Sequence, residues 1–456
     1  MKKIANMLVV FSIFLAVLLA DRGDLIDYTM TDEMSVDTAQ GVLNSLLSGI
    51  SGTSAPDCKY GIQMYSITYE TIDQFGEPTI ASGALIIPIN QMETLPLLSW
   101  HHGTQIDRDS VPSQTGALDI LTIWLGSTGY VSALPDFLGL GVSELFHPYQ
   151  INIPSANAVV DMLFASKQLC AMKDIYLNDQ LFLSGYSEGG YVTAAAQKMI
   201  EETYSDDFNI SGSTLLAGAY DMSGIMFDVM VSGEEYGEGF YLPYVILAYE
   251  DTYDVLEGDV SDYFLPEYAQ SVLPLFDGQN SGGTINAQIP SVPLEIFKPE
   301  FVSDIISDEN HPLRQKLREN DLYDWKPVSP TRFIHSTQDE LVPVENSQKA
   351  YDYFIQNGAE NVTIFLSDFG PHSSAAIDIV RSAYYWIDEL KNTQLFTVGD
   401  ANFDSLVNIS DIIITVNYIV QIQELDSVQR NLVDINNDNS IDIIDVILIV
   451  NLVLSI

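Results

Sequence analysis

Along the chain, short apolar runs alternate with longer segments in which apolar residues recur every three or four positions. Residues 61–71 and 79–87 are strand-like and predict an opening pair of antiparallel strands. Later runs are short and mainly apolar, four of them suited to buried parallel strands and two more being further strand candidates. These runs are residues 95–100, 130–134, 180–184, 213–218, 331–335 and 361–366.

Segments with helical periodicity lie between these runs. The clearest is residues 152–172, in which Ser155 is a candidate N-cap. Residues 113–125 and 375–391 have the same periodicity. Because strands and helices alternate, the pattern predicts a mostly parallel sheet with helices on both faces, an α/β fold.

The alternation stops between about residues 221 and 326. This stretch is rich in acidic and aromatic residues, most densely at residues 233–264. It predicts a largely helical insertion that forms a cap. Such a cap could be a solubilising excursion or a lid over an apolar site, and the recurring Tyr and Phe favour the lid.

A candidate nucleophile lies at the end of one predicted strand. Residues 185–189 have the sequence Gly-Tyr-Ser-Glu-Gly, which matches G-x-S-x-G, and a helical segment follows directly. A strand, a tight turn and a helix in this order place the serine hydroxyl at a helix N-terminus. We therefore predict Ser187 as the nucleophile; the alternative is a glycine-rich turn with an exposed serine.

A serine hydroxyl needs a base to remove its proton. Three histidines follow Ser187, and His372 is the candidate because its loop, FGPHSS, lies between the last predicted strand and the last helix. His335 falls within a strand and His311 within the cap, so both fit a structural role better.

The base in turn needs a carboxylate to orient its imidazole. Where the nucleophilic serine lies on such a strand–turn–helix, the three residues follow one another along the chain in the order serine, acid, histidine. Asp339 follows the strand at residues 331–335 and is the candidate acid, with Glu340 as its main rival and Asp368 as a weaker one.

Backbone N–H groups are expected to stabilise the oxyanion that forms during acyl transfer. One is predicted from Glu188, the residue after the nucleophile, and the other from the loop after residues 95–100, at Gly103 or Thr104. His101 and His102 precede these two residues. Adjacent side chains on a strand point to opposite sides, which disfavours a shared metal ion.

Four motifs in this order resemble the secretory lipase branch of the α/β-hydrolases. They are WHHGT (residues 100–104), ALPDFLGLGVSELFHPYQ (133–150), GYSEGG (185–190) and AGAYDMSG (217–224). The resemblance covers about residues 55–390. It implies the α/β-hydrolase fold, a helical cap between the sixth and seventh core strands, lipase or carboxylesterase activity, and the triad Ser187, Asp339 and His372. One departure is Glu188, where such sequences often have Gln.

From about residue 396 the composition shifts towards Asp, Asn, Ile and Val, and two similar loops appear. Each loop spaces oxygen-bearing residues as a calcium loop does, with a backbone carbonyl at its seventh position, and an apolar helix follows it. The predicted ligands are Asp400, Asn402, Asp404, Leu406, Asn408 and Asp411 in the first loop, and Asp434, Asn436, Asp438, Ser440, Asp442 and Asp445 in the second.

This tail resembles a dockerin, an all-α calcium module built from two EF-hand-type loop–helix units. The resemblance implies structural Ca²⁺ and a cohesin as partner. Ser405 and Asn439 stand at the sixth loop position, where Gly usually makes the turn. The tenth and eleventh positions, residues 409–410 and 443–444, are more apolar than in typical cohesin binders. A stiff stalk or a module for cell-surface attachment is therefore the alternative.

Composition and charge limit the binding partners and the cellular location that the chain can have. The formal net charge is −45, which excludes a nucleic-acid backbone or an anionic membrane surface as a partner. Residues 1–20 combine a basic start, an apolar run and a small residue at the cut, the pattern of a secretory signal peptide, with a membrane anchor as the alternative. After export, Cys58 and Cys170 could form a disulfide or remain thiols.

Together these features predict a secreted or surface-attached serine ester hydrolase that needs no catalytic cofactor. Its parts would be a signal peptide at 1–20, a hydrolase domain at 21–395 with the cap at 221–326, and a dockerin-like domain at 396–456. The substrate would be a lipid or small-molecule ester. The alternatives are a carbohydrate esterase, a prolyl-oligopeptidase-like serine peptidase, and a non-catalytic adhesion or scaffold protein.

Overall fold

A computed structural model describes residues 22–48, 54–89, 92–115 and 120–455. Within these residues ten strands form one sheet in the order β1-β2-β3-β5-β4-β6-β7-β8-β9, and β10 pairs with β4. The strands are β1 (Leu25–Met34), β2 (Ile62–Ile72), β3 (Pro78–Pro88), β4 (Glu93–His101), β5 (Val131–Pro135), β6 (Leu177–Tyr186), β7 (Ile210–Leu216), β8 (Thr331–Ser336), β9 (Val362–Ser367) and β10 (Gln394–Leu395).

The sheet changes from antiparallel to parallel at β5. Strands β1, β2, β3 and β5 pair antiparallel, whereas β5, β4, β6, β7, β8 and β9 run parallel. The predicted opening pair thus corresponds to β2 and β3. The sequence pattern missed β1, because most of its side chains are exposed at the edge of the sheet and it has no apolar face.

Helices cover both faces of the sheet. On β4, Leu98 packs in one buried cluster and its neighbour Leu97 in another, because successive side chains on a strand point to opposite faces. The first cluster includes residues of α2 (Val36–Leu47), α4 (Ile120–Ser127) and α14 (His372–Leu390). The second includes residues of α5 (Asn152–Met172) and α6 (Glu188–Thr203). The mostly parallel, two-sided α/β prediction is confirmed.

Helix boundaries differ from the sequence predictions at two places. Ser155 does not cap α5: it lies inside the helix, where its hydroxyl donates to the carbonyl of Ile151 at 2.7 Å, and Ile151 occupies the N-cap position. The predicted helix at residues 113–125 corresponds to α3 (Pro112–Thr115) and α4, between which residues 116–119 lie outside the described chain.

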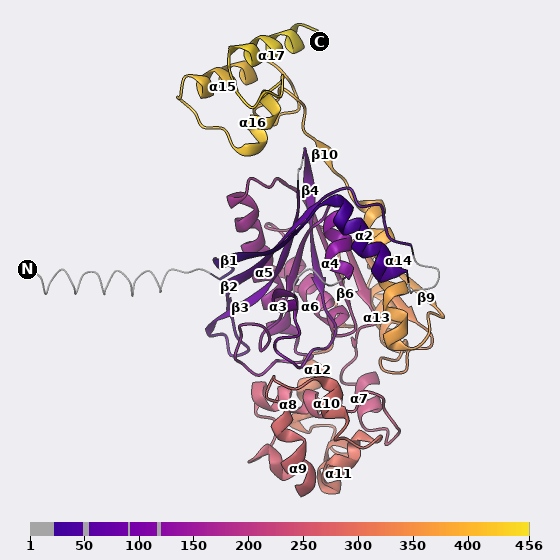
Figure 1. Cartoon of the computed structure of the whole chain (residues 1–456). Helices are drawn as coiled ribbons and strands as arrows, with labels where there is room; N and C mark the ends of the chain where they lie inside the picture. The colour runs from indigo at the N-terminus through magenta and orange to yellow at the C-terminus, as the bar shows by residue number, and fades with distance from the viewer. Residues whose placement is uncertain (1–21, 49–53, 90–91, 116–119, 456) are drawn as a thin grey trace, which may run out of the picture.

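The cap is the segment between β7 and β8, and it covers the carboxyl end of the parallel strands (Figure 1). Its helices are short, and several begin with a proline, which favours the first turn but cannot continue a helix. They are α7 (Ile225–Met230), α8 (Tyr241–Tyr253), α9 (Pro266–Ser271), α10 (Gly282–Asn286), α11 (Pro299–Ser307) and α12 (Pro312–Glu319). The buried side chains of the cap are continuous with those of β7, β8 and α13 (Glu345–Gln356).

The C-terminal segment forms a separate small bundle at the opposite end of the sheet from the cap (Figure 1). It contains α15 (Ile409–Ile419), α16 (Ser427–Val433) and α17 (Ile443–Ser455), with its own buried cluster. It contacts the larger domain through Tyr176, whose ring lies 4.6 Å from that of Phe403 and whose hydroxyl donates to Asp426. The short strand β10 leads into this bundle.

Three features bear on export. The predicted signal peptide at residues 1–20 lies outside the described residues. None of the helices in the described part of the chain has the length and apolar character needed to cross a membrane. Cys58 and Cys170 are both free thiols in this structure, and burial raises the pKa of Cys170 to about 12.

Candidate active site

Ser187 occupies a sharp turn between β6 and α6. Its backbone has φ 60° and ψ −119°, a strained conformation for a residue with a side chain. A Cβ on Gly185 would lie 2.3 Å from the carbonyl oxygen of Gly189, and one on Gly189 would lie 2.0 Å from that of His101. The two glycines of the motif are therefore required by the close approach of backbone segments around the serine.

His372 lies beside Ser187 although 184 residues separate them in the chain. It follows the loop after β9 and begins α14, and its side chain is buried. Its Nε2 lies 2.9 Å from Ser187 Oγ, and its Nδ1 lies 2.6 Å from Asp339 Oδ2. The three predicted side chains thus form one hydrogen-bonded chain.

Asp339 lies in the turn after β8 and is held from several sides. Its Oδ1 accepts hydrogen bonds from the backbone of Leu341 and Val342, at 3.1 and 2.8 Å. Burial acts to raise the pKa of Asp339, but hydrogen bonds from His335 and His372 outweigh it and hold this pKa well below its ordinary value. The carboxylate therefore stays ionised at neutral pH.

The rival acids have other positions. Glu340 accepts a hydrogen bond from the backbone N–H of His372 at 2.9 Å, so it contacts the main chain of the candidate base. Asp368 is exposed and accepts a hydrogen bond from the backbone N–H of Gly370.

The other two histidines that follow Ser187 also have other positions. His335 is buried on β8 with its Nε2 3.2 Å from Asp339 Oδ2, and His311 occupies the N-cap position of α12. Sequence reasoning missed the contact of His335 with Asp339.

Two of the predicted oxyanion donors, Glu188 and Gly103, lie next to Ser187. Glu188 begins α6, so its N–H has no acceptor within the helix. Gly103 packs against the serine turn, since a Cβ there would lie 3.7 Å from Ser187 Cβ. Thr104 Oγ1 lies 2.9 Å from the Tyr149 hydroxyl.

The paired histidines before Gly103 have different partners. The His101 side chain contacts Ser99 and Thr193, and burial lowers its pKa to about 3. The His102 side chain contacts backbone carbonyls, including that of Gly103. They lie on opposite sides of the strand end, and His101 is a neutral structural residue.

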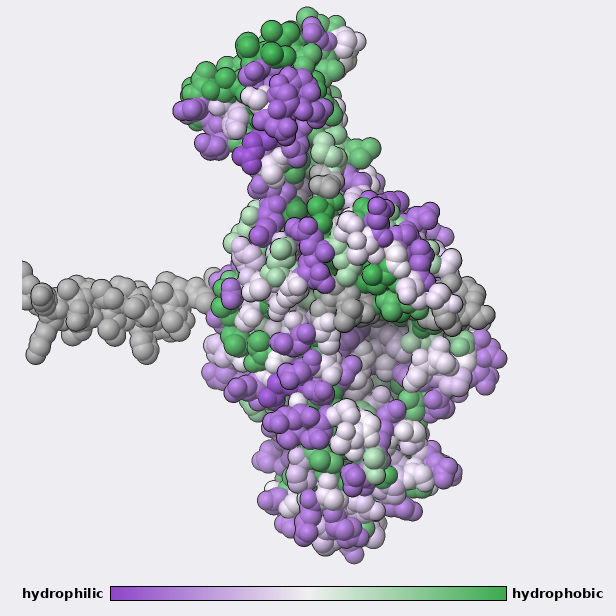
Figure 2. All heavy atoms as spheres, viewed as in Figure 1, coloured by the Kyte–Doolittle hydropathy of each residue, from purple (hydrophilic) through white to green (hydrophobic). Residues whose placement is uncertain are grey.

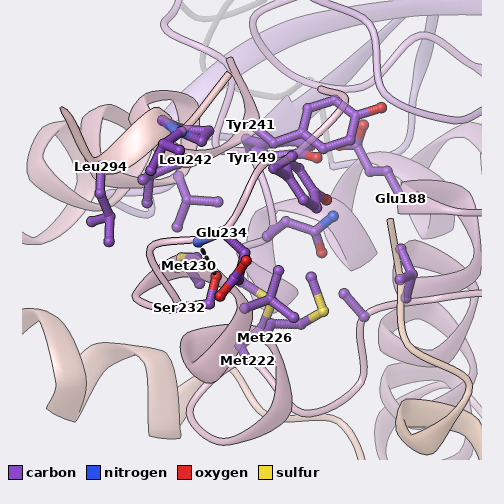
Figure 3. A pocket seen from close by; sticks show the side chains of 18 of the residues that line it. Tyr149, Glu188, Met222, Met226, Met230, Ser232, Glu234, Tyr241, Leu242 and Leu294 are labelled. Carbon is purple, nitrogen blue, oxygen red and sulfur yellow. Dashed lines mark hydrogen bonds between the residues drawn. The ribbon is translucent and has the colours of Figure 1, made fainter. Parts of the chain in front are cut away.

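A narrow cavity opens beside Ser187, between the hydrolase core and the cap. Its volume is about 60 Å³, and most of its walls are apolar. Figure 3 shows Met222, Met226 and Met230 on one side and Tyr149, Tyr241 and Glu188 on the other. Methionine is unbranched and flexible, so this wall can adjust its shape to an apolar group beside Ser187.

Glu188 makes a buried contact with His147 that the sequence did not indicate. Its Oε1 lies 2.7 Å from Nε2 of His147, and both side chains are almost fully buried. His147 belongs to the HPY part of the 133–150 motif, and its place in that motif was the one signal in the sequence. The side chain of Glu188, next to the nucleophile, therefore has a hydrogen-bonding partner in His147.

The two tail loops share one conformation. The sixth residues, Ser405 and Asn439, have φ 67° and 64°, the left-handed conformation that the turn of a calcium loop demands. In each loop the first aspartate accepts from the N–H of that residue, at 2.7 Å for Asp400 and 2.8 Å for Asp434. Across the described residues, no three His, Cys, Asp or Glu side chains form a group that could hold a metal ion. Any such site would therefore need amide and backbone oxygens as well.

Comparisons with known proteins identify a family and a relative of this chain. The sequence profile of the secretory lipase family matches residues 105–396. The chain is 22% identical over 380 residues to the secreted triacylglycerol lipase LIP4 of Malassezia globosa, covering 76% of each protein.

Solved structures of an esterase and a lipase are also similar to this chain. The rice cell wall degrading esterase LipA of Xanthomonas oryzae, in a ligand-bound form, is 30% identical with a TM-score of 0.73, covering 81% of this chain and 98% of that one. Candida antarctica lipase A, at 14% identity and a TM-score of 0.61 over 81% of this chain and 82% of that one, shows the same fold. The chain therefore belongs to the secretory lipase family and is a secreted hydrolase of carboxylic esters.

Proposed function

We propose that this enzyme cleaves lipid esters through a catalytic triad of Ser187, His372 and Asp339. The observation that carries the proposal is the chain of contacts from Ser187 Oγ to His372 Nε2, at 2.9 Å, and from His372 Nδ1 to Asp339, at 2.6 Å. Within it the imidazole can take the serine proton while the carboxylate fixes its orientation.

The reaction has two halves. Ser187 Oγ attacks the ester carbonyl carbon and its proton passes to His372 Nε2, which then gives it to the departing alcohol oxygen. A water molecule next attacks the acyl-enzyme, loses a proton to the same nitrogen and releases the acid, and Ser187 recovers its proton. In both halves the backbone N–H of Glu188 and that of Gly103 or Thr104 donate to the oxyanion.

An apolar cavity under the cap supports an acyl chain as the group that lies beside Ser187. The test is a graded series of 4-nitrophenyl esters from acetate to palmitate, with kcat/KM measured for each. We expect kcat/KM to rise from acetate to a medium-chain ester, because each buried methylene adds roughly 0.8 kcal/mol until the cavity walls stop yielding. A fall from acetate onwards would contradict an acyl-chain site in this cavity.

We also propose that each C-terminal loop binds one structural Ca²⁺, with the ligands predicted from the sequence. The donor set fits, because it offers carboxylate, amide and backbone oxygens, the hard ligands that calcium prefers. The shared left-handed turn at Ser405 and Asn439 supports the same assignment. The ion would supply charge neutralisation and rigidity to the loops and has no part in ester cleavage.

Removal of calcium tests this second proposal. In the full-length protein we expect native mass spectrometry to show two bound Ca²⁺ ions, falling to one in an Asp434→Ala variant. Asp368→Asn, which removes an exposed acid elsewhere, should keep both. The absence of bound calcium at millimolar free Ca²⁺ would contradict the assignment.

The surface of the C-terminal bundle supports attachment as its role. Figure 2 shows apolar side chains gathered along this bundle. Isoleucines next to the loops are exposed, among them Ile409 at 69% and Ile443 at 62%. A cohesin-like domain or another cell-surface component is the partner that we propose for this face, and such a partner would fix the enzyme outside the cell.

A further inference from the structure

Two residues that line the cavity beside Ser187 each have a buried oxygen atom with no hydrogen-bond partner among the described residues. They are Oε2 of Glu188 and Oε1 of Gln150, and both residues line this cavity. Their side chains are almost completely buried, at 1% and 5% exposure. An unpaired acceptor in a buried, mostly apolar place costs about 1–3 kcal/mol, so two at one site demand an explanation.

Glu188 is fixed in place by His147. Nδ1 of His147 lies 2.7 Å from the carbonyl oxygen of Leu138, which can only accept, so Nδ1 carries a hydrogen. Nε2 lies 2.7 Å from Glu188 Oε1, and that contact needs one proton between the two atoms. Whichever atom holds it, the pair is neutral as a whole. Oε2 is therefore an acceptor held in a fixed position.

Gln150 is fixed by its backbone. It has φ 57°, a strained conformation for this residue, and its carbonyl accepts a hydrogen bond from the Tyr249 hydroxyl at 2.9 Å. The neighbouring Tyr149 hydroxyl contacts Thr104 in the loop of the predicted oxyanion donors. Strained residues of this kind concentrate where a ligand is bound. Both residues thus line the same cavity as Ser187.

We propose that Glu188 and Gln150 accept hydrogen bonds from hydroxyl groups of the substrate, so that the enzyme prefers esters with a free hydroxyl close to the scissile bond. This inference rests on the proposed role of Ser187. A hydroxyl suits the site because it is small, donates a hydrogen bond and carries no charge, like the Glu188–His147 pair. The hydroxyl could belong to the acid, as in a 3-hydroxyacyl ester, or to the alcohol, as in a partial glyceride or a sugar ester.

The experiment compares two matched pairs of esters. Ethyl 3-hydroxybutyrate against ethyl butyrate places the hydroxyl on the acid, and glycerol 1-monobutyrate against propyl butyrate places it on the alcohol. We expect wild-type kcat/KM to favour the hydroxylated member at least about tenfold in one pair, the worth of one well-made hydrogen bond. The pair that shows the preference identifies the source. Ratios close to one in both pairs would overturn the proposal, and this measurement needs no variant.

Variants then locate the preference. Gln150→Leu and Glu188→Leu each remove an acceptor and should lower the ratio towards one. Glu188→Gln should keep it, since its amide can donate to His147 and leave an oxygen facing the cavity. Met226→Leu, in the apolar wall, is the matched control and should keep the ratio as well. A preference that survives both leucine variants would overturn the assignment to these residues.

A failure of the triad would look different. If Ser187→Ala retained hydrolysis of all four esters, the proposed nucleophile would be wrong, whatever the ratios. If Ser187→Ala were inactive and the ratios were flat, the triad would stand and the hydroxyl site would fall.

Discussion

Replacement of Ser187 by alanine is expected to lower kcat for 4-nitrophenyl butyrate by about a millionfold, the loss seen when the nucleophile of a serine hydrolase is removed. Without Oγ no acyl-enzyme forms, and the oxyanion donors retain only a weak effect on attack by water. KM should change little, because the cavity walls remain. The measurement is initial velocity at saturating ester, with folding checked by thermal unfolding.

Covalent labelling provides an independent readout for the same residue. Diethyl 4-nitrophenyl phosphate should add one diethylphosphoryl group to the wild-type chain and none to Ser187→Ala, as seen by intact mass. The matched control is Ser373→Ala, which removes an exposed serine next to His372 and should be labelled like the wild type. Labelling of the Ser187→Ala chain would mean that another residue is the nucleophile.

Asp339→Asn is expected to reduce kcat by about ten-thousandfold, as removal of the orienting carboxylate does in other serine hydrolases. An amide at this place can donate to His372 Nδ1 and so favours the tautomer that cannot accept the serine proton. The loss should appear in kcat and kcat/KM alike, because the carboxylate acts in the transition state. The pKa of Asp339 lies well below its ordinary value, so no group at this position should limit the rate between pH 5 and 8.

The rival acids are the controls for that variant. Glu340→Gln keeps an oxygen that can accept from the backbone N–H of His372, and Asp368→Asn changes an exposed side chain. Both should lose far less than Asp339→Asn. Equal losses in Glu340→Gln and Asp339→Asn would show that the carboxylate assignment is wrong.

The sequence predicted those parts of the fold whose signal is local. The buried strands have apolar runs, and residues 152–172 have a helical pattern that corresponds to α5. The order serine, acid, histidine led to the three side chains that the structure brings together. In contrast, β1 lies at an exposed edge and has no apolar face, so its pairing with β2 could not be seen in its own residues.

Contacts between distant segments account for the rest. His335 was assigned to a strand, correctly, but its contact with Asp339 depends on how the turn after β8 folds back. The Glu188–His147 contact joins residues 41 positions apart and forms only when the start of α6 meets the segment between β5 and α5. Neither contact produces a periodic pattern in the sequence. Both affect charged groups of the site, Asp339 and Glu188.

The placement of the C-terminal bundle has a consequence for how the enzyme would work when tethered. Tyr176 contacts Phe403 and Asp426 and so joins the bundle to the end of the sheet opposite the cap. A partner bound to the bundle would thus lie at the opposite end of the molecule from the cap and Ser187, and the cap would face the medium. Copies of the enzyme bound in this way would all present their cap end to the substrate.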